Sequence, residues 1–204
     1  MPQIYGAAAG PWRQTHPRAA STFLAAIAHR WWVAGGWALD LFLGTAARPH
    51  KDLDIGILRR DAPDVIASMS GFEFFEAMAG RLYRLESGTP RADVHSLWGR
   101  PLGTDQWVLE LLLDESEHRE WIFRRDRTIR YPLDLLVQYD ANQIPYLVPE
   151  IQLLYKASRT RFEDEADFER TAPHLSAHAR AWLRRAIASL DPAHRWLRSL
   201  DPWE

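Results

Sequence analysis

The sequence has no cysteine among its 204 residues. Disulfide bonds, thiolate nucleophiles and zinc sites built on cysteine are therefore excluded. No apolar run approaches the ~20 residues that span a bilayer, and no apolar segment follows a basic N-terminal stretch. The Gly-x-Ser-x-Gly motif of hydrolases and the Walker lysine motif are also missing. From these absences we expect a soluble, cytoplasmic protein whose chemistry uses neither a thiolate, nor a Gly-x-Ser-x-Gly serine, nor a Walker lysine.

An excess of positive charge is also lacking, because the net charge is −2. A surface that binds long nucleic acid needs clustered Lys and Arg, so the composition argues weakly against such a partner. One local basic cluster occurs, at Arg124, Arg125, Arg127 and Arg130. We interpret it as the charged surface of a hairpin, with a phosphate or RNA contact as the alternative.

The apolar fraction of 47% is ordinary for a globular protein, and hydrophobic periodicity predicts its elements. We expect an extended or poorly ordered stretch over 1–16. Helices are predicted over 17–30, 36–43 and 61–70, and strands over 31–34, 52–59, 72–77, 81–86, 92–98 and 107–113. A hairpin over 121–125 and 128–131 follows, and then helices over 132–139, 149–159, 162–170, 175–189 and 192–200. This order predicts an α/β (α+β) fold, with a mixed sheet flanked by helices in residues 1–131 and a helical domain in 132–204.

Two acidic residues, Asp52 and Asp54, follow the glycine doublet Gly35–Gly36. Side chains alternate along a strand, so the two acids point the same way with Cα atoms roughly 6.5 Å apart. Two carboxylates held that close repel each other unless a cation lies between them. Their hard oxygen ligands favour Mg²⁺ or Mn²⁺ over zinc. A metal site beside a glycine turn that opens a helix is typical of a nucleoside triphosphate site.

The string Gly35-Gly-Trp-Ala-Leu-Asp40, followed by Arg48-Pro-His-Lys-Asp-Leu-Asp54, resembles the signature of the polymerase-beta-type nucleotidyltransferase superfamily. It is similar to the branch that modifies aminoglycoside and lincosamide antibiotics. Residues 32–58 carry this resemblance, and the C-terminal third matches only loosely. The resemblance implies that two Mg²⁺ ions, roughly 3.5–4 Å apart, assist transfer from a nucleoside triphosphate to a hydroxyl group.

The resemblance also implies a third carboxylate on a neighbouring strand. We choose Glu110, because it is the one charge in the apolar run Trp107-Val-Leu-Glu-Leu-Leu-Leu113. A lone buried carboxylate is costly unless it is paired or binds a metal. A solvent-facing Glu110 is the alternative, and Asp114 and Asp93 are the competing candidates.

Four further residues are predicted to bind the nucleotide. Gly35 and Gly36 would let a phosphate approach the backbone at the start of a helix. Arg48 would hold a phosphate or pair with Asp40. Lys156 follows the helix start at Pro149 and looks like the lysine that antibiotic-modifying relatives use to contact the triphosphate, a solvated helix face being the alternative.

Neighbouring residues receive mainly structural roles. We expect Trp37 to pack, with stacking on a base or drug as the alternative. Asp40 is predicted to be buried and hydrogen-bonded, and His50 to be structural rather than catalytic. Glu150 suits the first turn of its helix, and it is also a candidate general base.

The predicted function is Mg²⁺-dependent transfer of a nucleoside monophosphate, with ATP as the expected donor, to a small hydroxylated acceptor. Aminoglycosides are cations and need acidic side chains, for which Glu163, Asp164, Glu165 and Asp167 are available. A toxin-like enzyme that modifies tRNA or protein is one alternative. A catalytically silent nucleotide-binding scaffold is the other.

Overall fold

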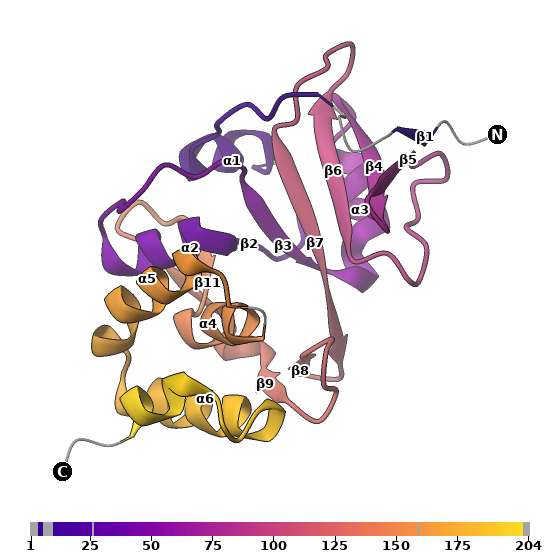
Figure 1. Ribbon diagram of the computed structural model, residues 1–204. Helices are drawn as coiled ribbons and strands as arrows, with labels where there is room; N and C mark the ends of the chain where they lie inside the picture. The colour runs from indigo at the N-terminus through magenta and orange to yellow at the C-terminus, as the bar shows by residue number, and fades with distance from the viewer. Residues whose placement is uncertain (1–3, 6–9, 26, 159, 202–204) are drawn as a thin grey trace.

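The computed structural model describes residues 4–5, 10–25, 27–158 and 160–201. Its main feature is a mixed sheet with strand order β1-β5-β4-β6-β7-β3-β2-β11-β10, and a small hairpin of β8 and β9 extends from β7. The strands are β1 (Ile4–Tyr5), β2 (Trp31–Val33), β3 (Asp54–Leu58), β4 (Phe72–Met78), β5 (Arg81–Arg84), β6 (Ser96–Pro101), β7 (Leu109–Glu117), β8 (Glu120–Ile122), β9 (Arg130–Pro132), β10 (Val137–Tyr139) and β11 (Pro145–Leu147). Figure 1 shows this sheet with the later helices gathered at one side of it. The predicted mixed sheet with flanking helices is confirmed.

The α-helices are α1 (Pro17–Phe23), α2 (Gly35–Leu43), α3 (Ala62–Ser68), α4 (Pro149–Ala157), α5 (Phe162–Thr171) and α6 (Ala177–Leu190). Short 3-10 turns lie at η1 (Arg59–Asp61), η2 (Leu133–Leu135), η3 (Ala172–His174) and η4 (Arg195–Leu200). The last three α-helices form the helical part of the chain, where α4 packs against α2, α5 and α6 (Figure 1). In the described part of the chain, no helix is both long and apolar enough to cross a membrane.

Most predicted elements are confirmed, but three differ in extent or type and a fourth, the helix over 132–139, is wrong altogether. The helix expected over 17–30 ends at Phe23, and residue 26 lies outside the described residues. The strand expected over 92–98 begins only at Ser96. The stretch 192–200 forms a 3-10 helix from Arg195 rather than a full α-helix.

The helix expected over 132–139 is wrong. Residues 133–135 make a single 3-10 turn, and β10 then pairs antiparallel with β11. The turn between these strands is built on Asp140, whose Oδ1 accepts backbone N–H groups of Asn142 and Ile144. Strand β11 lies parallel to β2, so the sheet continues to Leu147 and the α-helices resume at Pro149. The domain boundary at residue 131 stays a prediction.

The N-terminal stretch 1–16 was expected to be extended or poorly ordered. Residues 1–3 and 6–9 lie outside the described residues. Strand β1 pairs with β5, and Trp12 forms a bridge to Trp107. The described residues of this N-terminal stretch are therefore extended and attached to the sheet.

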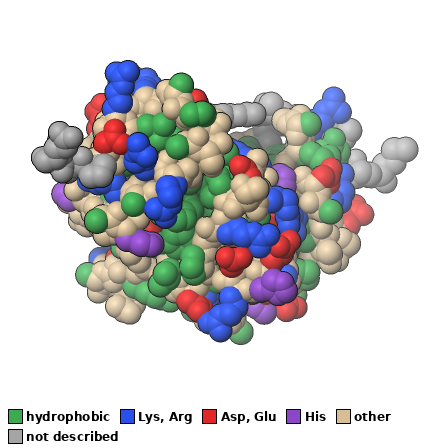
Figure 2. All heavy atoms as spheres, turned by 90° about the horizontal axis from the view of Figure 1, so that it is seen from below, with side chains coloured by type: hydrophobic (Ala, Val, Ile, Leu, Met, Phe, Trp, Pro, Cys, Tyr) green, Lys and Arg blue, Asp and Glu red, His purple; other side chains and the backbone are tan. Residues whose placement is uncertain are grey.

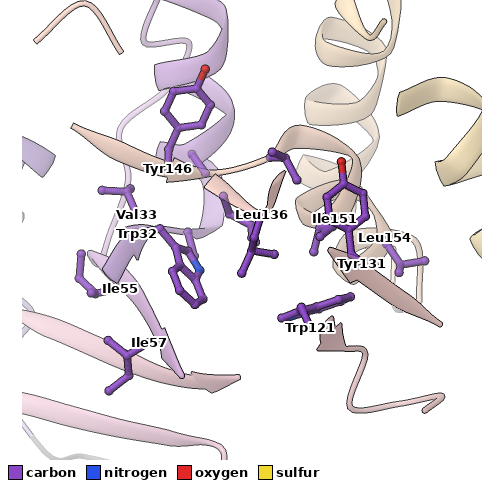
Figure 3. Close-up of a cluster of buried hydrophobic side chains, with 14 of the residues drawn as sticks. Trp32, Val33, Ile55, Ile57, Trp121, Tyr131, Leu136, Tyr146, Ile151 and Leu154 are labelled. Carbon is purple, nitrogen blue, oxygen red and sulfur yellow. The ribbon is translucent and has the colours of Figure 1, made fainter. Parts of the chain in front are cut away.

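The core lies on both faces of the central strands. Ile55 and Ile57 of β3, Trp32 of β2 and Ile151 of α4 are fully buried. Figure 3 shows Trp32 on the side of β3 that faces Ile151 and Trp121, and Ile55 and Ile57 on its other side. Burial of each large apolar side chain contributes roughly 1.5–3 kcal/mol, so packing on both faces holds β2 and β3 in place.

Candidate functional site

Three carboxylates meet at the start of the central strands. Asp54 opens β3, Asp52 lies two residues earlier, and Glu110 lies on β7. In the parallel pair β3–β7, Asp54 is in register with Glu110. The Glu110 N–H also donates to the carbonyl oxygen of Leu53 at 2.9 Å. This hydrogen bond joins the residue just before β3 to β7. As a result, ligand atoms of the three acids lie within 4.8 Å of one another.

The electrostatics of this triad disfavour three negative charges without a cation. Burial, then the charges of Glu110 and Asp52, raise the pKa of Asp54 well above its usual range. Burial, and the charge of Asp52, likewise raise the pKa of Glu110. Three oxygen donors with mutual repulsion are the donor set that a hard divalent cation stabilises. The residues present therefore fit Mg²⁺ or Mn²⁺.

The triad lines a cavity of about 620 Å³. This site cavity also receives side chains from α2, from the loop before β3, from α4 and from the start of α5. All seven residues predicted for the site line it, namely Gly35, Gly36, Arg48, Asp52, Asp54, Glu110 and Lys156. The fold thus brings them together, while their roles stay predictions.

The glycine doublet allows a close approach between α2 and the acids. Gly35 has a φ of +66°, and a Cβ there would lie 2.1 Å from Oδ2 of Asp54. A Cβ on Gly36 would lie 2.4 Å from the His50 ring. Both positions therefore exclude any larger residue, which explains the doublet physically.

The Gly35 amide is already engaged within the protein. Its N–H donates to Oε1 of Gln152 at 2.8 Å. This contact joins the start of α2 to α4. Sequence reasoning missed Gln152, because its partner lies 117 residues away in the chain and no local signal marks it. The expected phosphate contact at the doublet therefore falls to Gly36 and the amides after it.

Lys156 does not lie on a solvated helix face. It is 7% exposed, and its Nζ contacts Oδ1 of Asp164 at 2.7 Å and Oδ2 of Asp167 at 2.8 Å. Both carboxylates come from α5, so Lys156 joins α4 to α5 at the wall of the cavity. The triphosphate contact of Lys156 stays a prediction, and the two ion pairs were not predicted.

The alternative in which Arg48 pairs with Asp40 is wrong. Arg48 instead contacts Asp167 at 3.2 Å. Asp40 is buried, as predicted, and contacts Nε2 of His50 at 2.6 Å and a guanidinium nitrogen of Arg170 at 2.8 Å. Burial raises the pKa of Asp40, but the His50 and Arg170 hydrogen bonds outweigh it and hold the pKa below its usual range.

The two rings near the doublet pack together. The ring centroids of Trp37 and His50 lie 4.4 Å apart, and His50 is 5% exposed. The structural prediction for His50 and the packing prediction for Trp37 both agree with this contact. Trp37 also lines the site cavity, and the His16 ring packs against it at a centroid distance of 5.0 Å.

The competing acids lie elsewhere. Asp93 is exposed in a turn before β6. Asp114 is buried on β7 and accepts a hydrogen bond from the Tyr155 hydroxyl at 2.9 Å. Glu150 is buried, accepts a hydrogen bond from Tyr131 at 2.6 Å, and does not line the site cavity. The structure therefore gives no support to Glu150 as general base.

The basic cluster divides into two parts. Arg127 and Arg130 pair with Glu117 on the hairpin surface, at 2.6 Å and 2.9 Å. Arg125 lines the site cavity, where one of its guanidinium nitrogens donates to the Tyr155 carbonyl oxygen at 3.0 Å. The hairpin prediction is confirmed, because β8 and β9 pair antiparallel. From the sequence Arg125 was predicted only as a member of this cluster, and the structure places it in the site cavity.

Comparison with known proteins agrees with this geometry. Residues 18–105 match the sequence model of the family described as aminoglycoside-2''-adenylyltransferase. The range contains Gly35, Gly36, Arg48, Asp52 and Asp54. No curated protein matches the chain.

Solved structures with the same fold include two antibiotic-modifying enzymes. A crystal structure of ANT(2'')-Ia with adenylyl-2''-tobramycin is 14% identical, has a TM-score of 0.53, and covers 86% of this chain and 94% of its own. A lincomycin-bound crystal structure of the lincosamide adenylyltransferase LnuA is 14% identical, has a TM-score of 0.52, and covers 78% of this chain and 96% of its own. A solution structure of ANT(2'')-Ia, 14% identical, has a TM-score of 0.53 with coverages of 90% and 92%.

At 14% identity, these likenesses establish the fold, and the antibiotics are ligands of those proteins. Together with the family match, they confirm the resemblance to the aminoglycoside and lincosamide nucleotidyltransferases. The fold and the family match over residues 18–105 thus support an enzyme of the nucleotidyltransferase type.

Proposed function

We propose that this chain, whose residues 18–105 match the aminoglycoside-2''-adenylyltransferase family, transfers a nucleoside monophosphate from ATP to a hydroxyl group of a small molecule. The observation that carries the proposal is the triad of Asp52, Asp54 and Glu110 in the wall of a cavity large enough for a nucleotide and part of an acceptor.

In the proposed reaction, the acceptor hydroxyl oxygen forms a bond to the α-phosphorus of ATP. The bond from that phosphorus to the bridging oxygen breaks, pyrophosphate leaves, and the hydroxyl proton passes to solvent water. Mg²⁺ or Mn²⁺ held by Asp52, Asp54 and Glu110 would lower the pKa of the acceptor hydroxyl and stabilise charge on the phosphates.

The residues of the chain position the substrates. Gly36 lines the site cavity at the start of α2, where the helix dipole favours an anion. Lys156 and Arg48 place positive charge on the same wall of the cavity. Nε of Arg48 is buried without a hydrogen-bond partner among the described residues, so it has a donor available for a phosphate oxygen.

The geometry supports small acceptors better than RNA. Arg127 and Arg130 are engaged with Glu117, so the hairpin surface does not form a continuous basic groove. The antibiotics bound by the two similar structures are small hydroxylated molecules, which supports the same class of acceptor here.

The test is a transfer assay with Mg²⁺, ATP and a panel of hydroxylated antibiotics, read by the mass of the adenylylated product and by pyrophosphate release. We expect product with at least one acceptor and none with Asp54→Asn. Pyrophosphate release without any acceptor adduct, or equal activity of the variant, would contradict the proposal.

A further inference from the structure

The acidic segment Glu163–Asp167 reaches the site cavity, but its charge is already balanced within the protein. Glu163 and Asp164 line the cavity at the start of α5. A cationic acceptor such as an aminoglycoside would need acidic side chains of this kind to receive its ammonium groups. Whether these acids are already paired within the protein therefore determines how many ammonium groups of an acceptor the cavity can bind.

Asp164 is the most firmly engaged of them. It is 1% exposed, and it contacts Lys156 at 2.7 Å and Arg161 at 3.1 Å. Burial raises the pKa of Asp164, but these hydrogen bonds outweigh it and hold the pKa below its usual range. Asp164 is therefore ionised, and its negative charge is balanced by Lys156 and Arg161.

The other acids of the segment are also engaged. Asp167 is 4% exposed and contacts Lys156 at 2.8 Å and Arg48 at 3.2 Å. Glu165 pairs with Arg195 and accepts the indole N–H of Trp196 at 3.0 Å. Neither residue lines the cavity.

Only Glu163 keeps much of its charge available. Its pair with Arg161 is 3.7 Å long, and its side chain is 45% exposed. Exposed pairs at this distance are weak. The three remaining acids that line the cavity are Asp52, Asp54 and Glu110, which the proposed function assigns to metal.

The same wall carries as many basic residues as acidic ones. Arg48, Lys51, Arg125, Lys156 and Arg161 line the cavity. Figure 2 shows a comparable mixture on one face of the molecule, where acidic side chains lie next to Lys and Arg. A polycation would meet this mixture without finding acids to pair with its several ammonium groups.

We infer that the acceptor, under the proposed function, is a neutral or singly charged hydroxylated molecule rather than a polyamine. One exposed carboxylate, Glu163, matches at most one ammonium group. The chain thereby departs in specificity from an enzyme that binds a polycationic aminoglycoside.

The test is a binding measurement by calorimetry at low salt, with the protein loaded with Mg²⁺ and a non-hydrolysable ATP analogue. Tobramycin serves as the polyamine probe, and lincomycin as the probe with one amine. We expect no saturable tobramycin binding up to about 1 mM. Tobramycin binding in the micromolar range, weakening as salt is added, would overturn the inference.

A variant tests the reason for the expected result. The side chain of Arg161 is 66% exposed, so Arg161→Gln should fold. The variant loses the ion pair with Glu163 and one of the two cations that balance Asp164. We expect this variant to bind tobramycin saturably with a Kd below about 1 mM, in the range where the parent protein shows no binding. The matched control is Arg60→Gln, because Arg60 is also exposed and lies outside the cavity. An unchanged affinity in Arg161→Gln would contradict the argument from charge.

The analogue and the polyamine are read separately. Failure of the analogue to bind with Mg²⁺ would count against the proposed function. Tobramycin is also titrated into the metal-free protein, where the pairs of Asp164 and Asp167 are the same. The same titration of Asp54→Asn shows whether the triad itself binds the polyamine. Micromolar tobramycin binding by both metal-free proteins would overturn the inference about the acceptor and leave the proposed function untouched.

Discussion

Asp54 and Glu110 lie in register on two adjacent parallel strands, β3 and β7, at the centre of the sheet. The neighbouring residues Ile55 and Leu111 are fully buried and also in register. The two carboxylates are therefore held by rigid, packed elements rather than by loops. Sites on such elements keep their geometry better than sites on loops.

Replacing Asp54 with asparagine should separate catalysis from folding. We expect Asp54→Asn to reduce transfer by at least about a hundredfold, because it removes a charged oxygen ligand at the reacting phosphate. The pKa of Asp54 is raised, so its ionised form costs stability in the metal-free protein, and the variant should unfold at a higher temperature without metal. Thermal unfolding with and without Mg²⁺ checks both parts. A variant that is less stable without metal, or that retains full transfer, would disagree with the account.

Gly35→Ala should be far more damaging than Gly44→Ala. Both glycines have a left-handed φ, of +66° and +69°, so the backbone cost is shared and is roughly 1–2 kcal/mol. A Cβ on Gly44 meets nothing within 4 Å, whereas a Cβ on Gly35 collides with the Asp54 carboxylate. We expect Gly44→Ala to keep its activity and Gly35→Ala to lose transfer and Mg²⁺ binding. Equal activities, measured with folding checked by circular dichroism, would show that the close approach is unimportant.

Loss of Lys156 should destabilise the protein through its two partners. Lys156→Met removes the ammonium group that balances the buried carboxylates of Asp164 and Asp167. Loss of one partner of a buried ion pair lowers the free energy of unfolding by about 3–5 kcal/mol. We expect the double variant Lys156→Met, Asp164→Asn to recover part of this loss, since one unpaired charge disappears. Urea unfolding of the three proteins gives the comparison. No recovery in the double variant would mean that Lys156 stabilises mainly by packing.

Asp114 should make stability depend on pH. Burial raises the pKa of Asp114 to about 6 from 3.8 in the unfolded chain. The folded protein therefore binds more protons between these values, so the contribution of this residue falls as pH rises from about 4 to about 6. The expected difference is about 3 kcal/mol.

The variant Asp114→Asn isolates this effect. It should match the parent protein near pH 4 and be more stable above pH 6, because asparagine still accepts the Tyr155 hydrogen bond without a charge. Urea unfolding at a series of pH values measures the difference. A variant less stable than the parent above pH 6 would reverse the sign and contradict the prediction.

The acid pair and glycine doublet were predictable because they are local. Asp52 and Asp54 alternate with buried Leu53 and Ile55, and the turn at Gly35 needs a residue without a side chain. Glu110 could be found because a charge inside an apolar strand needs a partner. In each case, the pattern within a few residues carries the physical reason.

Contacts between distant segments were not predictable in the same way. The partners of Lys156 and Arg48 lie on α5, and sequence spacing alone does not fix how α5 packs. The helix expected over 132–139 was wrong because the short side chain of Asp140 builds a turn by accepting the backbone N–H groups of Asn142 and Ile144. That turn ends the apolar pattern and pairs β10 with β11.

The most direct test of the central claim is a thermal shift with Mg²⁺ and each nucleoside triphosphate, run beside Asp52→Asn. A ligand that binds only the folded protein, at about a hundred times its Kd, stabilises it by roughly 2.7 kcal/mol. The account predicts a stabilisation with ATP that requires Mg²⁺ and disappears in the variant. No shift with any triphosphate, or an equal shift in Asp52→Asn, would contradict a metal-dependent nucleotide site at this triad.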